Sequence, residues 1–306
     1  MSSVHKAIRS PWHEGEIEVQ ARAGVREEAD QLSGMYRREV PSAMAGFLVQ
    51  QQFAVLSTAD QNQRVWATLV AGAPGMVEVP RMDRVALLQD KIETELPIGD
   101  LVSNARVGLL VIDFSRRIRM RINGTASAAS NGSMEIGIDE LYGNCSQYIQ
   151  KRLIEGASPE HRPSRVVSGI SLTESEGKLI ERADTFFLAS RHPERGADAS
   201  HRGGKPGFVQ VASPTQLSFP DYAGNNMFNT LGNIRVNPAV GLLFVDFESG
   251  TALQVSGDAT VDWTGERRLQ FPKAQRVVDV NISEVRQIEN ATSLRFRFIG
   301  YSPTLE

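Results

Sequence analysis

Short apolar runs separated by polar turns dominate the chain, which is the pattern of an antiparallel β protein. The run Leu253–Val261 alternates apolar and polar residues with period two, as expected for a half-buried strand. Phe53–Ser57 and Phe186–Ser190 predict two further strands, and the tail Leu294–Ile299 predicts a last one. Several short strands with closely spaced turn signals favour a small barrel or sandwich over a parallel sheet. We therefore expect a mainly β fold with peripheral helices, in the α+β class.

The same patterns return at a constant interval along the chain. GLLVIDF at Gly108–Phe114 is repeated almost unchanged as GLLFVDF at Gly241–Phe247, an offset of 241 − 108 = 133 residues. The same offset separates Asn104–Gly108 from Asn237–Gly241, Ile122–Ala126 from Val255–Ala259, and Phe53–Ser57 from Phe186–Ser190. A fixed period of this kind indicates that one fold unit is present in two diverged copies.

The predicted organisation has four parts: an N-terminal arm and helix at residues 1–46, a first copy at 47–130, a helical linker at 131–178, and a second copy with a C-terminal strand at 179–306. Pro41 opens an amphipathic stretch, and Glu140–Leu153 is expected to be a helix. Thr173-Glu-Ser-Glu176 is a capping box that starts the helix leading into the second copy. The second strands are matched as Trp66–Ala71 with Gly207–Ala212, and the third strands as Met76–Val79 with Gln216–Phe219.

Composition narrows the class of protein. The 306 residues carry 33 basic and 36 acidic side chains, so no overall field favours a nucleic-acid partner. A single cysteine, Cys145, and the absence of a signal-like or membrane-length apolar run predict a soluble, cytoplasmic protein. Common catalytic signatures are missing, and five histidines with one cysteine offer no metal-ligand spacing. We therefore predict no metal site and assign no catalytic residue.

The segment Ser190–Gly207 concentrates basic side chains around Gly203-Gly204, namely Arg191, His192, Arg195, His201, Arg202 and Lys205. As a loop, it would present cations and backbone N–H groups to an anion. A solvated hairpin loop is the alternative explanation. The loop matched to it in the first copy, Ser57–Val65, carries only one cation, Arg64. This contrast favours an anion site in the second copy.

A second polar segment, Phe219–Asn233, runs from a strand end through a glycine turn into a helix. It carries five side chains that can cap a helix or hydrogen-bond a ligand: Asn225, Asn226, Asn229, Thr230 and Asn233. Capping needs one or two of them. The remainder are candidates for ligand binding.

Three motifs in the second copy carry a family resemblance: S-H-R-G-G-K-P-G-F, L-S-F-P-D-Y-x-G-N-N and N-x-x-x-N-P-x-V-G-L-L-F. Together they resemble the FMN-binding split β-barrel superfamily of pyridoxamine 5′-phosphate oxidase-like proteins, almost throughout the second copy and more weakly in the first. The resemblance implies two tandem antiparallel split β-barrels, FMN at an interface between barrels, and a homodimer. It further implies an FMN-dependent oxidoreductase that acts with a small-molecule substrate or electron donor of unknown identity.

The residues expected to bind FMN are Arg191, Ser200, His201, Arg202, Lys205, Pro206, Gly207, Phe208, Val209, Asp221, Tyr222, Asn225, Asn226, Asn229, Thr230 and Asn233. The basic segment would hold the phosphate, while Pro206–Val209 and Asp221-Tyr222 would lie along the ring and the ribityl chain. One departure stands out. A Ser-Arg-Lys-like triplet grips the phosphate in the oxidases, and the matching positions here, Asn225, Asn226 and Met227, carry no cation.

Phosphate binding would then fall to Arg202, His201, Arg191 or Lys205, unless the cofactor has been lost. Two other functions stay open on the sequence alone. One is a split barrel that binds or senses flavin or haem without turnover, and the other is a cofactor-free interaction protein.

Overall fold

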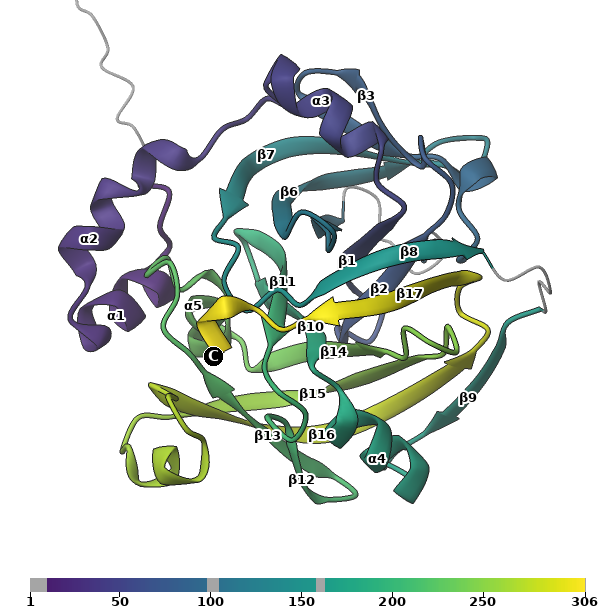
Figure 1. Ribbon diagram of the computed structural model, residues 1–306. Coiled ribbons are helices and arrows are strands. Elements are labelled where there is room, and N and C mark those ends of the chain that lie inside the picture. The colour runs from purple at the N-terminus through teal and green to yellow at the C-terminus, as the bar shows by residue number, and fades with distance from the viewer. Residues whose placement is uncertain (1–9, 98–104, 158–162, 306) are drawn as a thin grey trace, which may run out of the picture.

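The computed structural model describes residues 10–97, 105–157 and 163–305. Two antiparallel sheets make up most of them (Figure 1). The first sheet has the order β2-β1-β5-β6-β7-β4-β3. Its strands are β1 (Phe53–Ala59), β2 (Val65–Ala71), β3 (Val77–Arg81), β4 (Arg84–Leu87), β5 (Arg106–Asp113), β6 (Ile118–Ala128) and β7 (Met134–Asn144).

The second sheet has the order β11-β10-β14-β15-β16-β13-β12, with β9 (Arg165–Gly169) paired to β16. Its other strands are β10 (Thr185–His192), β11 (Gly196–Gly203), β12 (Gln210–Ser213), β13 (Gln216–Asp221), β14 (Ala239–Val245), β15 (Ala252–Asp262) and β16 (Arg276–Glu289). Strand for strand this is the order of the first sheet, and the chain has the fold of two antiparallel split barrels. The repeated GLL motifs fall on β5 and β14, which hold equivalent places.

A separate ribbon pairs β8 (Lys151–Ala157) with β17 (Leu294–Gly300), as the tail pattern predicted. The helices are α1 (Glu14–Ala23), α2 (Arg26–Gln31), α3 (Ser42–Val49), α4 (Glu174–Arg182) and α5 (Asn229–Val236), with short 3₁₀ turns at Ser33–Met35, Gln89–Lys91, Glu266–Gln270 (η4) and Pro303–Leu305. In the described ranges, no helix combines the length and apolar character needed to cross a bilayer.

Each sheet encloses its own apolar core, and a third cluster joins them. The joining cluster includes Phe53 of the first sheet, Phe187 and Phe247 of the second half, and Phe296 of β17. The ring centroid of Phe53 lies 5.5 Å from that of Phe187 and 5.8 Å from that of Phe296. Fully burying a phenylalanine contributes about 1.5–3 kcal/mol, so this cluster fixes the two sheets against each other.

The first glycine of each GLL motif lies where one sheet crosses the other. A Cβ at Gly108 would stand 2.8 Å from the Cα of Asp198, and one at Gly241 would stand 2.6 Å from the carbonyl oxygen of Val65. No larger residue fits either position without moving backbone. The motif is therefore repeated because both copies make the same close approach, each to the other sheet.

Several sequence-based expectations are wrong. The stretch Glu140–Leu153 is not a helix, because its residues belong to β7, a bridging segment and β8. The alternating burial of β7 from Met134 to Ile138 and its pairing with β6 show why this stretch is extended. β7 also belongs to the first sheet, although the predicted boundary of the first copy falls at residue 130.

The segment Ser190–Gly207 is mostly strand rather than loop, because β11 occupies Gly196–Gly203 and pairs with β10 along its whole length. The matching of the second and of the third strands is also off by one strand. By sheet order β2, which contains Trp66–Ala71, corresponds to β11, whereas Gly207–Ala212 overlaps β12. By sheet order β13, which contains Gln216–Phe219, corresponds to β4, whereas Met76–Val79 overlaps β3, the equivalent of β12. The capping box at Thr173 and Glu176 and the helix that follows Pro41 are both confirmed.

Candidate functional site

A cavity with about 100 Å³ of free space lies between the two sheets. β6 and the segment after β7 form its wall on the first-half side. β11, the end of β13 and the start of α5 form the wall on the second-half side. The ionisable side chains that line it are Arg119, Arg121, His201, Arg202, Asp221 and Arg276, together with Cys145, Tyr148 and Tyr222.

Three of the four arginines are paired with carboxylates. Arg121 Nη1 donates to Asp198 Oδ1 at 3.0 Å, and both side chains are buried. Arg202 Nη1 and Arg276 Nε share the carboxylate of Asp221 at 3.0 and 2.8 Å. These three cations are paired with only two carboxylates, which leaves one positive charge in excess.

Arg119 forms no ion pair with any carboxylate of the described residues. Its Nη1 contacts the ring Nδ1 of His201 at 3.1 Å and the carbonyl oxygen of the same residue at 3.3 Å. Burial, together with repulsion from Arg121 and Arg202, lowers the pKa of Arg119 to about 9. The side chain is therefore still charged at neutral pH, and the cavity carries uncompensated positive charge.

His201 is held neutral beside these cations. Burial and the charges of Arg119 and Arg152 lower its pKa well below the ordinary value. Because Arg119 donates to Nδ1, the neutral ring carries its proton on Nε2. That nitrogen is buried and has no hydrogen-bond partner among the described residues.

Four buried donors around the cavity lack a partner in the described residues: Arg119 Nε, Arg121 Nε, Arg202 Nε and His201 Nε2. Buried polar groups are almost always hydrogen-bonded, so each exception needs a physical reason. Several N–H donors and an excess of positive charge around one space suit an anion that offers several oxygen acceptors. The residues present therefore fit a phosphate group.

Nine of the sixteen residues expected to bind a ligand line the cavity: His201, Arg202, Phe208, Asp221, Tyr222, Asn225, Asn226, Asn229 and Thr230. The others lie elsewhere. Arg191 donates to Gln63 at an exposed contact, Lys205, Pro206 and Gly207 form an exposed turn, and Val209 is part of the core of the second sheet. Ser200 and Asn233 are buried behind the cavity wall, where they bind Thr230 and Ser190 respectively.

The sequence reading missed Arg119, Arg121, Tyr148 and Arg276. A signal for the first two was present, because Arg119 and Arg121 lie two residues apart on one strand and therefore on the same face. The positions 133 residues later on the chain are Ala252 and Gln254, which carry no cation.

The matching surface of the first sheet carries different side chains. Strand pairing makes Ala67, Val70 and Ala71 of β2 equivalent to Asp198, His201 and Arg202 of β11. Gln254, the equivalent of Arg121, donates to the carbonyl oxygen of Ala67 at 2.8 Å and to Thr68 Oγ1 at 3.1 Å. Apolar side chains and a satisfied amide thus occupy the place that cations occupy on the other side.

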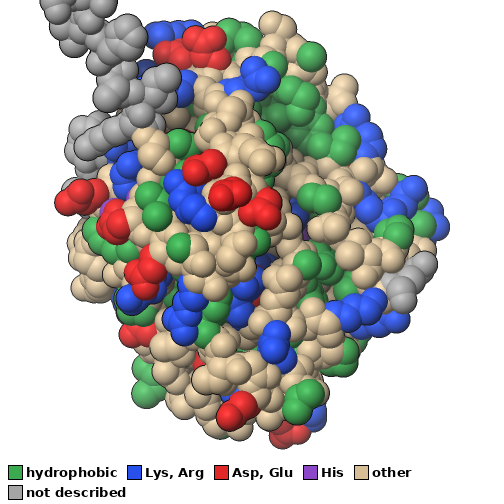
Figure 2. Space-filling model, turned by 90° about the vertical axis from the view of Figure 1, so that its left-hand side faces the viewer, with side chains coloured by type: hydrophobic (Ala, Val, Ile, Leu, Met, Phe, Trp, Pro, Cys, Tyr) green, Lys and Arg blue, Asp and Glu red, His purple; other side chains and the backbone are tan. Residues whose placement is uncertain are grey.

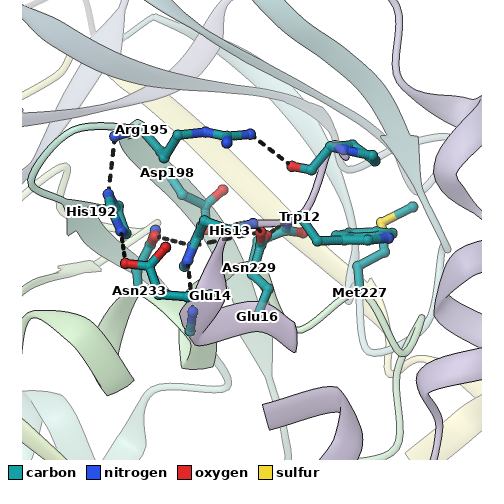
Figure 3. Close-up of polar contacts among 12 residues, drawn as sticks. Trp12, His13, Glu14, Glu16, His192, Arg195, Asp198, Met227, Asn229 and Asn233 are labelled. Atoms are coloured by element: carbon teal, nitrogen blue, oxygen red, sulfur yellow. Dashed lines mark hydrogen bonds and ion pairs between the residues drawn. The ribbon is translucent and has the colours of Figure 1, made fainter. Parts of the chain in front are cut away.

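The N-terminal arm contacts Asn229, one of the residues that line the cavity (Figure 3). Asn229 Nδ2 donates to Glu16 Oε1 at 2.6 Å and to the hydroxyl of Tyr36 at 2.7 Å. Burial raises the pKa of Glu16 to about 8. Met227, at one of the positions where the oxidases carry a cation, is buried with Trp12 in a small apolar cluster.

His13, Glu14 and His192 gather their side-chain ligand atoms within 4.8 Å of one another at the start of α1. The Nδ1 atoms of His13 and His192 accept backbone N–H groups from Gly15 at 3.1 Å and Arg195 at 3.0 Å, so each ring carries its proton on Nε2. Those Nε2–H groups donate to Asn233 at 3.0 Å and to Glu14 at 2.9 Å, as Figure 3 shows. Neither ring has a free lone pair for a metal, so the cluster is a hydrogen-bond network.

Comparison with known proteins locates a relationship in the second half of the chain. The family model described as pyridoxamine 5′-phosphate oxidase matches residues 172–298. None of the curated proteins matches the chain.

Among solved structures, a candidate pyridoxamine 5′-phosphate oxidase from Lactobacillus delbrueckii is 26% identical, covers 38% of this chain and 93% of its own, and has a TM-score of 0.31. HupZ from Group A Streptococcus is 14% identical, with 37% and 91% covered and a TM-score of 0.31. A FAD-binding protein from Mesorhizobium loti is 14% identical, with 40% and 97% covered and a TM-score of 0.29. The family match, which spans the strands and the helix on the second-half side of the cavity, carries the assignment. Residues 172–298 are thus similar to the pyridoxamine 5′-phosphate oxidase family, and the two sheets of the chain have the split β-barrel fold.

Proposed function

We propose that the chain binds FMN in the cavity between the two sheets and acts as an FMN-dependent oxidoreductase. The observation that carries the proposal is that four side chains lining one cavity, those of Arg119, Arg121, His201 and Arg202, each have a buried donor without a partner among the described residues. A phosphate monoester is nearly dianionic at pH 7 and offers three strong acceptor oxygens. The family of the second half supports a flavin as the bearer of that phosphate.

The two halves would divide the work of holding the cofactor. Arg119 and Arg121 of β6 supply cations that the Asn225–Met227 turn lacks, while His201 and Arg202 complete the phosphate site from β11. Asn229, fixed by Glu16 and Tyr36, would orient the ligand through its side-chain oxygen.

Two tyrosines mark the place for a planar ring. The rings of Tyr148 and Tyr222 lie 5.2 Å apart, 19° from parallel, and both line the cavity. The free space of about 100 Å³ suits a phosphate but is smaller than the roughly 300–1,000 Å³ of cofactor pockets. A flavin ring would therefore enter by displacing this pair and would stack on one of the two rings. The bound flavin would supply the hydride chemistry, and the protein its position and electrostatic setting.

The spectrum of the purified protein tests the proposal against its two rivals. We expect a yellow, flavin-type spectrum that bleaches on addition of a reduced nicotinamide. Colour without bleaching would favour a binder of flavin or haem without turnover. No colour after FMN has been added would favour a cofactor-free interaction protein.

Riboflavin provides a sharper test, because it keeps the ring and lacks the phosphate. We expect FMN to bind at least tenfold more tightly than riboflavin, since charge-assisted hydrogen bonds contribute about 1.5–3 kcal/mol each. Equal affinities would show that the cavity does not bind the phosphate, and the main support for the proposal would be lost.

We extend the proposal to a cytoplasmic homodimer. A single cysteine in 306 residues is typical of a reducing compartment, and paired barrels are common in the family named above. Light scattering should give about twice the 33.6 kDa of one chain. A constant mass of one chain at all concentrations would exclude the dimer.

A further inference from the structure

A second groove adjoins the cavity, between the end of α1 and the loop that carries η4. It has a volume of about 320 Å³. Asn226, Phe228 and Arg276 line both spaces, so the groove and the cavity are neighbours that share part of their walls. α1 and the η4 loop lie on the same side of the molecule (Figure 1). We call it the Trp263 groove, after the aromatic residue in its wall.

Arginine side chains cover the aromatic surface of the Trp263 groove. The guanidinium carbon of Arg22 lies 4.5 Å from the ring centroid of Trp263. That of Arg276 lies 5.1 Å from the same ring and 4.8 Å from the ring of Phe228. A guanidinium group and a heteroaromatic base both stack on the face of an aromatic ring. A base could therefore occupy the positions that these guanidinium groups take over the aromatic rings.

The Trp263 groove is positively charged, and its walls contain no carboxylate. Among the described residues, Arg22 makes the ring contact and no ion pair, and Arg268 binds only the carbonyl oxygen of Gly265, at 3.4 Å. The wider face behaves differently, because acidic and basic side chains are interspersed over the side that carries α1 and α2 (Figure 2). Unpaired cations are thus a local property of the Trp263 groove.

We propose that the Trp263 groove binds the phosphate and the aromatic base of a nucleotide. The base would stack on Trp263, and Arg22, Arg268 and Arg276 would contact the phosphate. The inference rests on the proposed function in one respect, because the groove shares three wall residues with the proposed flavin cavity. The same nucleotide chemistry has two sources: a separate nucleotide, such as the nucleotide end of an electron donor, or the adenylate half of FAD whose flavin half fills the cavity.

Calorimetric titration of ADP into protein saturated with FMN tests the first source. We expect one ADP per chain, with a dissociation constant that rises about tenfold in Arg22→Ala and in Arg268→Ala. FMN affinity should be unchanged in both variants. Arg267→Ala is the matched control, because Arg267 lies beside Arg268 in η4 but pairs with Asp279 and Ser218 outside the groove.

Comparison of FAD with FMN on the apoprotein tests the second source. If the adenylate half occupies the Trp263 groove, FAD binds about tenfold more tightly than FMN, and Arg22→Ala removes the difference. Failure of ADP to bind FMN-loaded protein, together with equal affinities for FAD and FMN, would overturn the inference. Equal competition by inorganic phosphate would reject a nucleotide in favour of a simple anion. Binding of ADP to protein that takes up no flavin would keep this inference and reject the proposed function.

Discussion

Replacing Arg119 with alanine removes the one cavity arginine that has no carboxylate partner in the described part of the chain. If its guanidinium binds the FMN phosphate, the loss of one charge-assisted hydrogen bond costs about 1.5–3 kcal/mol. That range corresponds to a dissociation constant for FMN about 10- to 150-fold higher, at about 1.4 kcal/mol per decade. Riboflavin binding should hardly change, because riboflavin has no phosphate for Arg119 to contact.

The same substitution should not destabilise the apoprotein. The pKa of Arg119 is lowered from 12.5 to about 9, so the unfolded chain binds more protons than the folded chain between these values. Stability contributed by this group therefore rises with pH above about 9, and at pH 7 the charged side chain opposes folding. We expect the Tm of apo Arg119→Ala to equal or exceed that of the wild type.

Quenching of flavin fluorescence on binding gives both affinities, and differential scanning calorimetry gives the Tm. Affinity of the wild type for FMN should also fall as pH passes about 9, where free Arg119 loses its charge, and this step should be absent in Arg119→Ala. Arg116→Ala is the control, because Arg116 is exposed and pairs with Asp113. An unchanged FMN affinity in Arg119→Ala, or an equal loss for riboflavin, would refute the assignment of Arg119 to the phosphate.

Three other outcomes follow from contacts described above. Arg202→Ala should weaken FMN binding about 10- to 150-fold, and Arg202→Glu should weaken it further. Arg64→Ala, on the matching turn of the first sheet, should leave the affinity within twofold. A large loss of affinity in Arg64→Ala alone would place the binding site in the first sheet. The pKa of Glu16 is raised to about 8, so the folded state binds more protons than the unfolded state between pH 4.5 and 8, and the stability contributed by Glu16 falls across that range. Glu16→Gln should remove this decline when the free energy of unfolding is measured in urea at pH 5 and pH 8. A decline equal to that of the wild type would contradict the burial of the charge. Gly108→Ala and Gly241→Ala should each lower the free energy of unfolding by about 1–3 kcal/mol through overpacking. Only Gly108→Ala should also weaken FMN binding, because the new methyl group meets Asp198 beside Arg121. Equal effects of the two variants on FMN binding would contradict a site at only one crossing of the sheets.

Local patterns in the sequence predicted the elements whose residues serve only the fold. The alternation at Leu253–Val261 and the capping box at Thr173 describe β15 and α4 correctly, because burial and capping leave direct marks on residue type. The composition of β11 predicts a loop, because Asp198, Ser200 and Arg202 put polar groups where a strand ordinarily places apolar ones. Distant side chains satisfy these polar groups, since Arg121 and Thr230 bind Asp198, Thr230 binds Ser200, and Asp221 binds Arg202. Local propensity cannot reveal such partners.

Some of the cavity residues could be predicted from local composition, and others could not. His201, Arg202 and Asn229 lie on the segments whose composition drew attention to them. Arg119 reaches the cavity only because β6 crosses β11, a contact between residues 82 apart in sequence. Arg276 enters through its pairing with Asp221 on a neighbouring strand, 55 residues away. Contacts at such separations depend on the packing of the two sheets, which residue spacing does not determine.

The two sheets lie on one chain, and this permits a kind of change that a dimer of identical single barrels cannot make. In such a dimer every substitution appears twice, so a residue that improves one interface site must also be tolerated in its symmetry mate. Here Arg121 can bind Asp198 while its counterpart Gln254 binds the backbone at Ala67. One crossing of the sheets can therefore adapt to chemistry while the other adapts to rigidity, and each chain should bind a single flavin.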